Sequence, residues 1–584
     1  MPQPSYIFSP DADSPQARRF GVMVAKNFHL PPQLGEILFV RGIKTLNAAE
    51  HFLHPQLAML PSPASMKGMD AAVNLVLAAY RKRQPILIHG DYDVDGITST
   101  TLLTAFFREI GIPTAYVIPN RLEERYGLSR HSIERLMQQM DRPERGGLLI
   151  TVDCGISALE EVAYARHQGL QVIITDHHEP QAELPQTEAI LNPKQQDCSF
   201  PFDQLAGVGV AFFLMMGLRK AFTEHGLIDG TRINLKKYLD LVALGTVADV
   251  VPLVGINRVL VRAGLEVLSE KRRPGIFALC ERCGIADRAI LTEDISFKLA
   301  PRINASGRLG APVIGVELLL AGTSQDAQKP AESLDRFNTE RKALELQALE
   351  AIEEQCRQQL AMGREGLAIY HQGCHPGVLG IVASRIAERF GRPVIIFTDE
   401  QVGNDTNCLK GSGRSIAGIH LFQLLEQCRE CIGQYGGHAM AIGLTIEQSN
   451  LEQFAQQFNR QVSRLGEDVL GQGRGIEIDY HFTEKKHLTK YFAQALQQLQ
   501  PFGEGNPDPT FLLSSERLVH PKHSNGHLRF QVQANGHVFP GIGFRLAEKG
   551  HNYQDPHDLI FHLKRSWFRG VEHDQVQAIH VLSR

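Results

Sequence analysis

The fold of this protein is decided by one short stretch of its sequence, Ile86-Leu87-Ile88-His89-Gly90-Asp91-Tyr92-Asp93-Val94-Asp95-Gly96. The apolar run that ends at Ile88 predicts a buried strand, and a helical pattern begins after Asp95. Between the two, one histidine and three aspartates fall within seven residues. Buried carboxylates are costly unless a positive charge pairs with them. The stretch therefore predicts a strand, a turn that faces a cation, and a helix.

The region from 85 to 195 alternates apolar runs with helical patterns. The runs are nearly continuous, as expected for strands that are covered on both faces. Ser157-Ala158-Leu159-Glu160 fits a capping box that opens one of the helices. Strands that alternate with helices predict an α/β fold with a doubly wound parallel sheet. The predicted strands are Pro85–Ile88, Thr114–Ile118, Gly147–Val152, Gln171–Thr175 and Ala189–Leu191.

The pattern changes twice further along the chain. A helical region covers roughly 205–345, and a long helical pattern at Asp326–Met362 predicts a connecting helix. From about 365 a second α/β pattern begins, with strands at Gly366–Tyr370 and Pro393–Phe397. From about 460, short β-like runs between turn residues predict a small barrel or sandwich. These runs are Gly475–Ile478, Thr510–Leu513, Leu528–Gln533, Val538–Phe544, Leu559–Leu563 and Val576–Val581.

Composition limits the possible functions. The 584 residues are 43% hydrophobic and 21% charged, which predicts several soluble globular domains. The formal net charge of -4 excludes a generally basic surface, so nucleic acid would bind through local clusters or metal ions. The N-terminus has no basic segment followed by an apolar one, and no apolar run reaches membrane-spanning length. We expect a cytoplasmic protein without a membrane contact.

Nine cysteines without a compact disulfide spacing predict reduced thiols. The pairs Cys280/Cys283 and Cys428/Cys431 have the spacing of zinc ligands. They lie far apart in sequence and outside a ribbon-like frame, which favours reduced, partly buried cysteines over a structural zinc site.

Metal-ligand side chains follow four separate apolar segments. His89, Asp93 and Asp95 follow the first segment. Because ligands of open α/β sheets bind outside the carboxyl ends of the strands, we expect these segments to converge at one edge. The other three segments are followed by Asp153, by Asp176-His177-His178 and by Asp249.

The ligand types indicate which metal binds. Imidazole and carboxylate without thiolate predict Mn²⁺ or Mg²⁺ rather than calcium. The ligands are too many for one ion, so we expect two cations about 3.5–4 Å apart that share a bridging carboxylate. Such a pair would lower the pKa of a shared water and neutralise charge on a phosphorus centre. The alternative is that these side chains are helix caps and solvated histidines. For Asp91, which is off the His89-Asp93-Asp95 spacing, a helix cap is the preferred interpretation.

At these residues the sequence resembles the DHH phosphoesterase family, which is named for the Asp-His-His at positions 176–178. The resemblance rests on His89–Gly96, Val152–Gly155, Asp176–His178 and Gly245–Leu253, which occur in the family's order. It extends from about 50 to the C-terminus. Three further segments are similar to the exonuclease branch of the family, namely Pro301–Gly310, His375–Arg385 and Gly411–Ser415, and Gly436–Gly443 is similar to the signature of the associated second domain.

The resemblance implies a fold and an activity. The activity is a metal-dependent exonuclease that degrades single-stranded DNA from 5′ to 3′ to 5′-mononucleotides in DNA recombination and repair. The implied organisation is an N-terminal segment (1–49), a DHH domain (50–255), a helical connector (256–362), a DHHA1-type α/β domain for substrate (363–458) and an OB-like β-barrel for nucleic acid (459–584).

The resemblance also implies residue roles. Asp153 would bridge the two cations and His178 would lie against the scissile phosphate, so these two are the catalytic candidates. The second cation would be held by His89 and Asp93 together with Asp153. The first would be held by Asp95, Asp153, His177 and Asp249.

Glycine-rich segments with arginines predict phosphate contacts, because glycine lets the backbone approach a phosphate and arginine binds it with two donors. The alternative is that the glycines only make turns and the arginines form surface ion pairs. His438 is a candidate mainly through the resemblance. The predicted substrate contacts are Arg302, Asn304, Ser306, Arg308, Ser384, Arg385, Ser412, Arg414 and His438.

The C-terminal aromatics Phe530, Phe544 and Trp567 would stack bases on a barrel surface or form its core. The expected partners are single-stranded DNA, a single-stranded-DNA-binding protein and a repair helicase, and the expected state is a monomer. One rival function is a phosphodiesterase or pyrophosphatase for small substrates. Another is a non-catalytic nucleic-acid-binding scaffold, which would have damaged ligand positions, whereas all of them are present here.

Overall fold

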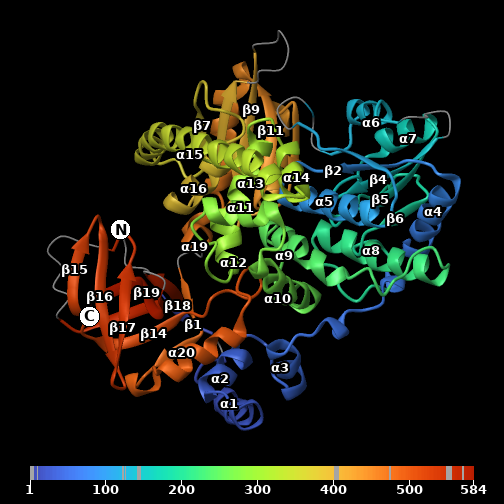
Figure 1. Cartoon of the computed structure of the whole chain (residues 1–584). Helices are drawn as coiled ribbons and strands as arrows, with labels where there is room; N and C mark the ends of the chain where they lie inside the picture. Colours follow the sequence, from blue (N-terminus) through green and yellow to red (C-terminus); the bar gives the residue numbers. More distant parts are fainter. Residues whose placement is uncertain are drawn as a thin grey trace. The chain divides into compact units, whose positions relative to one another are not determined.

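The computed structural model describes residues 6–9, 11–120, 124, 127–140, 146–399, 407–471, 475–546, 555–568 and 571–583 (Figure 1). The chain forms two compact units. Unit 1 contains 1–59, 252–262 and 474–584, and unit 2 contains 60–251 and 263–473. Among the described helices, none has the length and apolar character that crossing a membrane requires. The predicted boundaries of the five segments stay predictions.

The first sheet of unit 2 is parallel throughout, with the strand order β3-β2-β4-β5-β6. Its central strands β2, β4 and β5 are largely apolar and buried because helices cover both faces. One face carries α6 (Arg130–Met137) and α7 (Leu159–His167), and the other carries α4 (Met69–Lys82), α5 (Val94–Glu109) and α8 (Gly207–Glu224) (Figure 1). The predicted doubly wound sheet is confirmed. Its strands are β2 (Ile86–Gly90), β3 (Thr114–Val117), β4 (Gly147–Val152), β5 (Leu170–Thr175) and β6 (Ala189–Leu191).

The predicted capping box at Ser157 is wrong. Helix α7 begins at Leu159, and Ala158 is its N-cap without a side-chain hydrogen bond. Ser157 lies in the preceding turn, because the chain first brings the N–H of Ile156 to Asp176 Oδ2, at 2.9 Å. A contact at the functional edge of the sheet therefore determines where this helix starts.

Helices follow the first sheet, as predicted. The long one, α15 (Ser324–Ala361), is capped by Thr323 and packs against α11, α13 and α14 near its start and against α16 and β7 near its end. It therefore connects the first sheet's helices to the second α/β layer. The other helices of this region are α9 (Leu239–Ala248), α10 (Gly255–Glu270), α11 (Pro274–Arg282), α12 (Thr292–Asp294), the π-helix η5 (Ile295–Leu299), α13 (Ala300–Arg308) and α14 (Val313–Leu320).

The second sheet of unit 2 has the order β10-β11-β9-β8-β7, with β7 and β8 parallel and the other pairs antiparallel. Cys428 and Cys431 are buried in its core, and all nine cysteines are free thiols. Its elements are β7 (Leu367–Tyr370), α16 (Leu379–Phe390), β8 (Val394–Asp399), β9 (Cys408–Arg414), α17 (Leu421–Glu426), β10 (Gln434–Gly437), β11 (Ala441–Glu447), α18 (Leu451–Ser463) and α19 (Gly466–Gly471).

Unit 1 contains a seven-stranded sheet with the order β13-β14-β18-β19-β17-β16-β15. Phe530 belongs to its core, whereas Phe544 is 53% exposed, so the predicted aromatics divide between core and surface. The sequence missed β13 because it is short and β15 because it is polar. The seven strands are β13 (Tyr480–Phe482), β14 (Phe511–Glu516), β15 (Val519–Ser524), β16 (His527–Ala534), β17 (His537–Gly543), β18 (His557–Phe568) and β19 (Val571–Ser583), and β12 (Ile476–Ile478) lies outside this sheet.

The N-terminal segment folds onto this C-terminal sheet. Strand β1 (Tyr6–Phe8) pairs in parallel with β12. Apolar side chains such as Leu34 and Phe492 share one core. The helices of this unit are α1 (Pro15–Phe28), α2 (Pro32–Val40), α3 (Leu46–Leu53) and α20 (Lys490–Leu496).

A buried arginine stabilises unit 1. Arg258 is 2% exposed, and its guanidinium lies 3.6 Å from the ring centre of Phe52. It donates to the carbonyls of Phe52, Gln498, Leu499 and Gln500 at 2.8–3.3 Å. We expect Arg258→Met to destabilise the protein by at least about 3 kcal/mol, because several buried carbonyls lose their donor. Urea unfolding checks this, with Arg19→Met as a matched control on an exposed position of the same unit. Equal stability of the two variants would contradict it.

Candidate metal centre

The predicted ligands come together at the carboxyl edge of the first sheet. His89 lies near the end of β2, Asp153 follows β4 directly and His177 follows β5. Two helix ends supply the others, because Asp95 lies in the first turn of α5 and Asp249 is the C-cap of α9.

His177 is the centre of the cluster. Its Nε2 lies 3.1 Å from Asp153 Oδ1, 3.6 Å from Asp249 Oδ2 and 3.8 Å from Asp95 Oδ2. Among the described residues, three groups of side chains each place their ligand atoms within 4.8 Å of one another, and Asp153 belongs to two of these groups. The groups are Asp95/His177/Asp249, Asp153/His177/His178 and Asp91/Asp93/Asp153. Adjacent groups with a shared carboxylate are the arrangement that two cations require.

The backbone around these ligands is tightly constrained. Asp153 has a φ of 61°, the left-handed region that non-glycine residues rarely adopt. The first amides of α8 hold Asp95, because the N–H groups of Gly207 and Val208 donate to its Oδ2 and Oδ1 at 2.6 and 2.8 Å. Gly207 also leaves no room for a side chain, since a Cβ there would lie 2.7 Å from the Cβ of Asp153. Asp95 and Asp153 are thus fixed by the same turn, which the sequence analysis missed although Gly207-Val208-Gly209 at a helix start was its visible signal.

The charges in the cluster are incompatible without a cation. Burial, and then the charge of Asp93, raise the pKa of Asp95 to about 7. Burial, and then the charges of Asp95 and Asp93, raise the pKa of Asp249 to about 9. Burial and the neighbouring carboxylates also raise the pKa of Asp153 well above its ordinary value. Burial, and then the charge of His178, lower the pKa of His177 to about 3, so it is the neutral imidazole that a metal needs.

The donor set fits divalent cations. Among the described residues, the buried polar atoms of the cluster that accept or donate no hydrogen bond include His89 Nε2, Asp153 Oδ1, His177 Nε2 and Asp249 Oδ2. Buried polar atoms without hydrogen bonds are costly, and a bound cation would satisfy them. Carboxylates mixed with imidazole and without thiolate suit Mn²⁺ or Mg²⁺.

Asp176 holds His178 rather than lying in a ligand group. Its Oδ1 lies 2.7 Å from His178 Nδ1 and also accepts from the backbone N–H groups of His177 and His178. Burial alone would lower the pKa of His178, but the hydrogen bond and charge of Asp176 outweigh burial and raise it. The sequence analysis counted Asp176 among the metal-ligand side chains, whereas none of the three ligand groups formed by the described residues contains it.

Two residues of the first motif, Asp91 and His89, differ from expectation in the structure. Asp93, and not Asp91, is the N-cap of α5, where its Oδ1 accepts from the N–H groups of Asp95 and Gly96. Asp91 is buried within reach of Asp93 and Asp153, so the preferred interpretation of Asp91 as a helix cap is wrong. His89 is in none of the three ligand groups formed by the described residues, and its Nδ1 lies 3.5 Å from Cys154 Sγ.

A cleft of 1240 Å³ lies over the cluster. Arg308 Nη1 donates to the carbonyl of Gly377, and Asn304 Oδ1 accepts from the N–H of Val94, so helix α13 joins the cleft to both α/β layers. Arg130 and His131, which the sequence analysis did not single out, also line the cleft. The predicted site residues that line it are Asp93, His178, Asn304, Arg308 and His438.

The remaining predicted substrate contacts lie elsewhere. Ser306 is fully buried, and its hydroxyl donates to the carbonyl of Ile303. Arg302 pairs with Asp335 at 2.8 Å, and Arg385 pairs with the buried Glu345 at 2.7 Å. These three do not line the cleft: Ser306 bonds within α13, and the two arginines pair with acids of α15.

Ser384, Ser412 and Arg414 gather at the start of α16. Ser384 Oγ donates to the carbonyl of Gly380, and Arg414 Nη1 donates to Ser412 Oγ at 3.3 Å. A Cβ on Gly380 would lie 2.6 Å from Arg414 Nη2, so a side chain there would displace the guanidinium.

The metal-free protein should lose stability as the pH rises. The pKa of Asp249 is about 9 in the folded chain against 3.8 ordinarily. Its contribution to the free energy of unfolding is therefore fully present below about pH 4 and is lost as the pH rises through about 9. In EDTA, we expect the Tm of the wild type to fall more between pH 6 and pH 9 than that of Asp249→Asn, by several degrees. Mn²⁺ should abolish the difference in slope, since ionised carboxylates bind it. Parallel slopes in EDTA would contradict the buried cluster.

The buried carboxylates need cations to neutralise them, and the cleft beside them is lined with arginine and histidine. These are the features of a metal-dependent phosphoesterase. Family profiles identify the branch: the DHH family N-terminal domain matches residues 85–246, the DHHA1 domain 363–464 and the RecJ OB domain 478–580. The chain belongs to the DHH family and, within it, to the RecJ proteins.

The relatives are similar over most of their length. The single-stranded-DNA-specific exonuclease RecJ of Salmonella typhimurium is 40% identical over 536 residues, which are 88% of this chain and 89% of the relative. The Bacillus subtilis protein of the same name is 34% identical and covers 90% of this chain and 64% of its own. The crystal structure of RecJ in complex with Mn²⁺ from Thermus thermophilus has a TM-score of 0.80 at 28% identity and covers 98% of this chain and 79% of that chain.

Proposed function

We propose that this protein is an exonuclease that hydrolyses single-stranded DNA from 5′ to 3′ to 5′-mononucleotides with two divalent cations, Mn²⁺ or Mg²⁺. The observation that carries the proposal is the buried cluster around His177, in which Asp153 belongs to two ligand groups and Asp93 and His178 line the cleft. Relatives that cover most of this chain bear the name of single-stranded-DNA-specific exonucleases.

The chain's own residues divide the work. Asp95, Asp153, His177 and Asp249 would hold one cation, and Asp153 with Asp93 and His89 would hold the other. When bound, the cations lower the pKa of a water and neutralise charge on the phosphate. The α8 amides keep Asp95 oriented, and Asp176 keeps a proton on His178 Nδ1. Asp176 raises the pKa of His178 and so favours its imidazolium form, which would stabilise charge that develops on the scissile phosphate.

Substrate would lie along the cleft. Asn304, Arg308 and His438 line it, and we assign them to the phosphates nearest the cluster. Ser412 and Arg414 would bind a phosphate at the start of α16, where a helix N-terminus favours an anion. A narrow entry to this cleft would admit a single strand and reject a duplex by size.

The test uses a long single-stranded DNA labelled at either end, with Mn²⁺, with Mg²⁺ and with EDTA. We expect metal-dependent release of mononucleotides from the 5′ end and little cleavage of a blunt duplex. Activity that stops after a first cut or occurs only on dinucleotides would favour a small-substrate phosphodiesterase. Binding without hydrolysis would favour a scaffold. Equal rates on single strand and duplex would refute selection by size.

We further propose that the protein acts in the cytoplasm as a monomer in DNA recombination and repair, and meets a single-stranded-DNA-binding protein and a repair helicase on its substrate. The support is the substrate itself, which both partners also bind. Light scattering should give the mass of one chain. Faster degradation of strands coated with the binding protein than of strands coated with an unrelated one would support a direct contact, and equal rates would refute it.

A further inference from the structure

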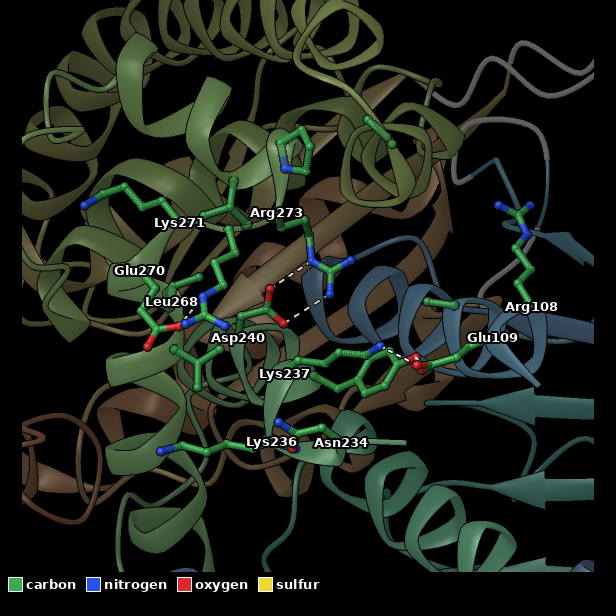
Figure 2. A pocket seen from close by; sticks show the side chains of 18 residues that line it. Arg108, Glu109, Asn234, Lys236, Lys237, Asp240, Leu268, Glu270, Lys271 and Arg273 are labelled. Carbon is green, nitrogen blue, oxygen red and sulfur yellow. Dashed lines mark hydrogen bonds and ion pairs between the residues drawn. The ribbon is translucent and has the colours of Figure 1, made fainter. Parts of the chain in front are cut away.

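A second pocket lies in unit 2, at the far ends of two helices that carry candidate metal ligands (Figure 2). Its volume is 870 Å³. Helix α5 has Asp95 in its first turn and ends with Arg108 and Glu109 in the pocket. Helix α9 has Asp249 as its C-cap and Asp240 in its first turn, where it lines the pocket. The pocket and the cleft share no lining residue among those described.

The carboxylates of the pocket are already paired with cations. Asp240 accepts from Arg273 Nε and Nη2 at 2.8 and 3.2 Å. Glu109 accepts from Lys237 Nζ at 2.6 Å and from the hydroxyl of Tyr238. The third, Glu270, pairs with Arg272 at 2.8 Å. Dashed lines in Figure 2 mark the Arg273–Asp240 and Lys237–Glu109 pairs.

Three basic side chains that line the pocket pair with none of its three acids. Among the described residues, no carboxylate lies within ion-pair distance of Arg108, which is exposed at the pocket's edge (Figure 2). Lys271 Nζ is held by two carbonyls, those of Ser269 and Arg288, rather than by an acid. Lys236 has only a distant partner, Glu266 at 3.9 Å. A concave pocket focuses the field of such an excess, so it attracts an anion.

The charge and size of the pocket favour one chemical class. An excess of three positive charges matches a polyphosphate better than a single carboxylate, and the fork of an arginine binds phosphate oxygens with two donors. A volume of 870 Å³ is in the range of pockets that hold nucleotide-sized ligands. The start of α11, at Pro274, also lines the pocket and adds the partial positive charge of a helix N-terminus. We propose that this pocket is a second anion site, which binds the phosphate groups of a nucleotide or of a nucleic-acid strand.

The test measures binding in EDTA, so it does not depend on hydrolysis or on the proposed exonuclease function. The probe is inorganic tripolyphosphate, followed by calorimetry and by the Tm. The variant is the double substitution Arg108→Gln and Lys236→Gln, which breaks no ion pair shorter than 3.9 Å. We expect at least ~10-fold weaker binding and loss of the rise in Tm that tripolyphosphate causes in the wild type. The Tm of the variant without the probe should be unchanged, which shows that it folds.

Two further variants make the result specific. Lys220→Gln changes an exposed lysine of α8 outside both pockets and should bind as the wild type does. Arg414→Ala changes the proposed phosphate contact at α16 and should also keep the binding. Loss of binding in Arg414→Ala alone, or unchanged binding in the double variant, would overturn the proposal. Binding of an octa-aspartate peptide without binding of tripolyphosphate would also overturn the proposal.

Two sources of phosphate can be told apart with the same double variant. If the ligand is a free nucleotide, dATP binding weakens by ~10-fold while KM for DNA of any length stays constant. If the ligand is a distant part of the DNA, KM rises for strands of forty nucleotides and not for strands of five. If Lys220→Gln weakened the binding of dATP and of long DNA to the same extent, the cause would be the general charge of the protein, and this outcome would refute a specific site.

Discussion

Asp153→Asn should lower the rate of DNA hydrolysis at least ~10³-fold and at the same time raise the Tm of the metal-free protein. The rate falls because Asp153 is the carboxylate that two ligand groups share, so its loss affects both cations. The Tm rises because a buried carboxylate whose pKa burial has raised becomes a neutral amide of the same shape. A substitution that merely damaged the fold would lower both quantities.

Asp153→Asn is measured with end-labelled DNA in Mn²⁺ and by thermal unfolding in EDTA and in Mn²⁺. Asp287→Asn is the matched control, since Asp287 is exposed in the same unit and should leave rate and Tm unchanged. Full hydrolysis by Asp153→Asn would remove this residue from the metal centre. A lower Tm in EDTA would show that its carboxylate is stabilised by something other than a cation.

Gly207→Ala should lower the rate of hydrolysis by ~10²-fold, although Gly207 itself contacts neither metal nor DNA in the proposed mechanism. A Cβ at this position would lie 2.7 Å from the Cβ and 2.8 Å from Oδ1 of Asp153. The same residue's N–H donates to Asp95 at 2.6 Å. Because one added methyl group would move two ligands, we expect weaker Mn²⁺ binding as well as slower hydrolysis.

Gly209→Ala is the control that this helix provides. Gly209 lies two residues later in α8, where a Cβ would approach only Leu205, at 3.4 Å, an ordinary contact distance. It should keep full activity and gain up to about 1 kcal/mol of stability, because alanine favours a helix more than glycine does. Titration of Mn²⁺ against Tm separates the two variants. If both bind Mn²⁺ equally well, crowding at Gly207 does not position the ligands.

Much of the fold could be predicted from the sequence because its signals are local. The runs at Gly147–Val152 and Ala189–Leu191 have the same bounds in the structure, since a strand covered on both faces must be apolar throughout. The strand β15 (Val519–Ser524) was missed because its burial is slight and its residues are polar. The start of α7 was misplaced because Ile156 satisfies Asp176, a partner that comes from another strand.

The site could be predicted in part for the same reason. Asp153, His177 and Asp249 are the type of residue that binds metal and they follow apolar segments, so their meeting follows from the geometry of a parallel sheet. The sequence cannot show which polar atoms have been taken by the protein itself. Arg302 and Arg385 have the chemistry of phosphate contacts, but Asp335 and Glu345 on α15 pair with them.

By itself, the sequence determined the parallel sheet, the long helix and the ligand types, because periodicity and side-chain chemistry are written along the chain. Only the tertiary structure decided how the N-terminal segment joins the C-terminal sheet, which carboxylates crowd until their pKa values rise, and that Gly207 constrains Asp95 and Asp153 together. It also decided that Lys236, Lys271 and Arg108 line one pocket. The physical reason is that each of these facts is a distance between residues remote in sequence, and such distances exist only once the core has packed.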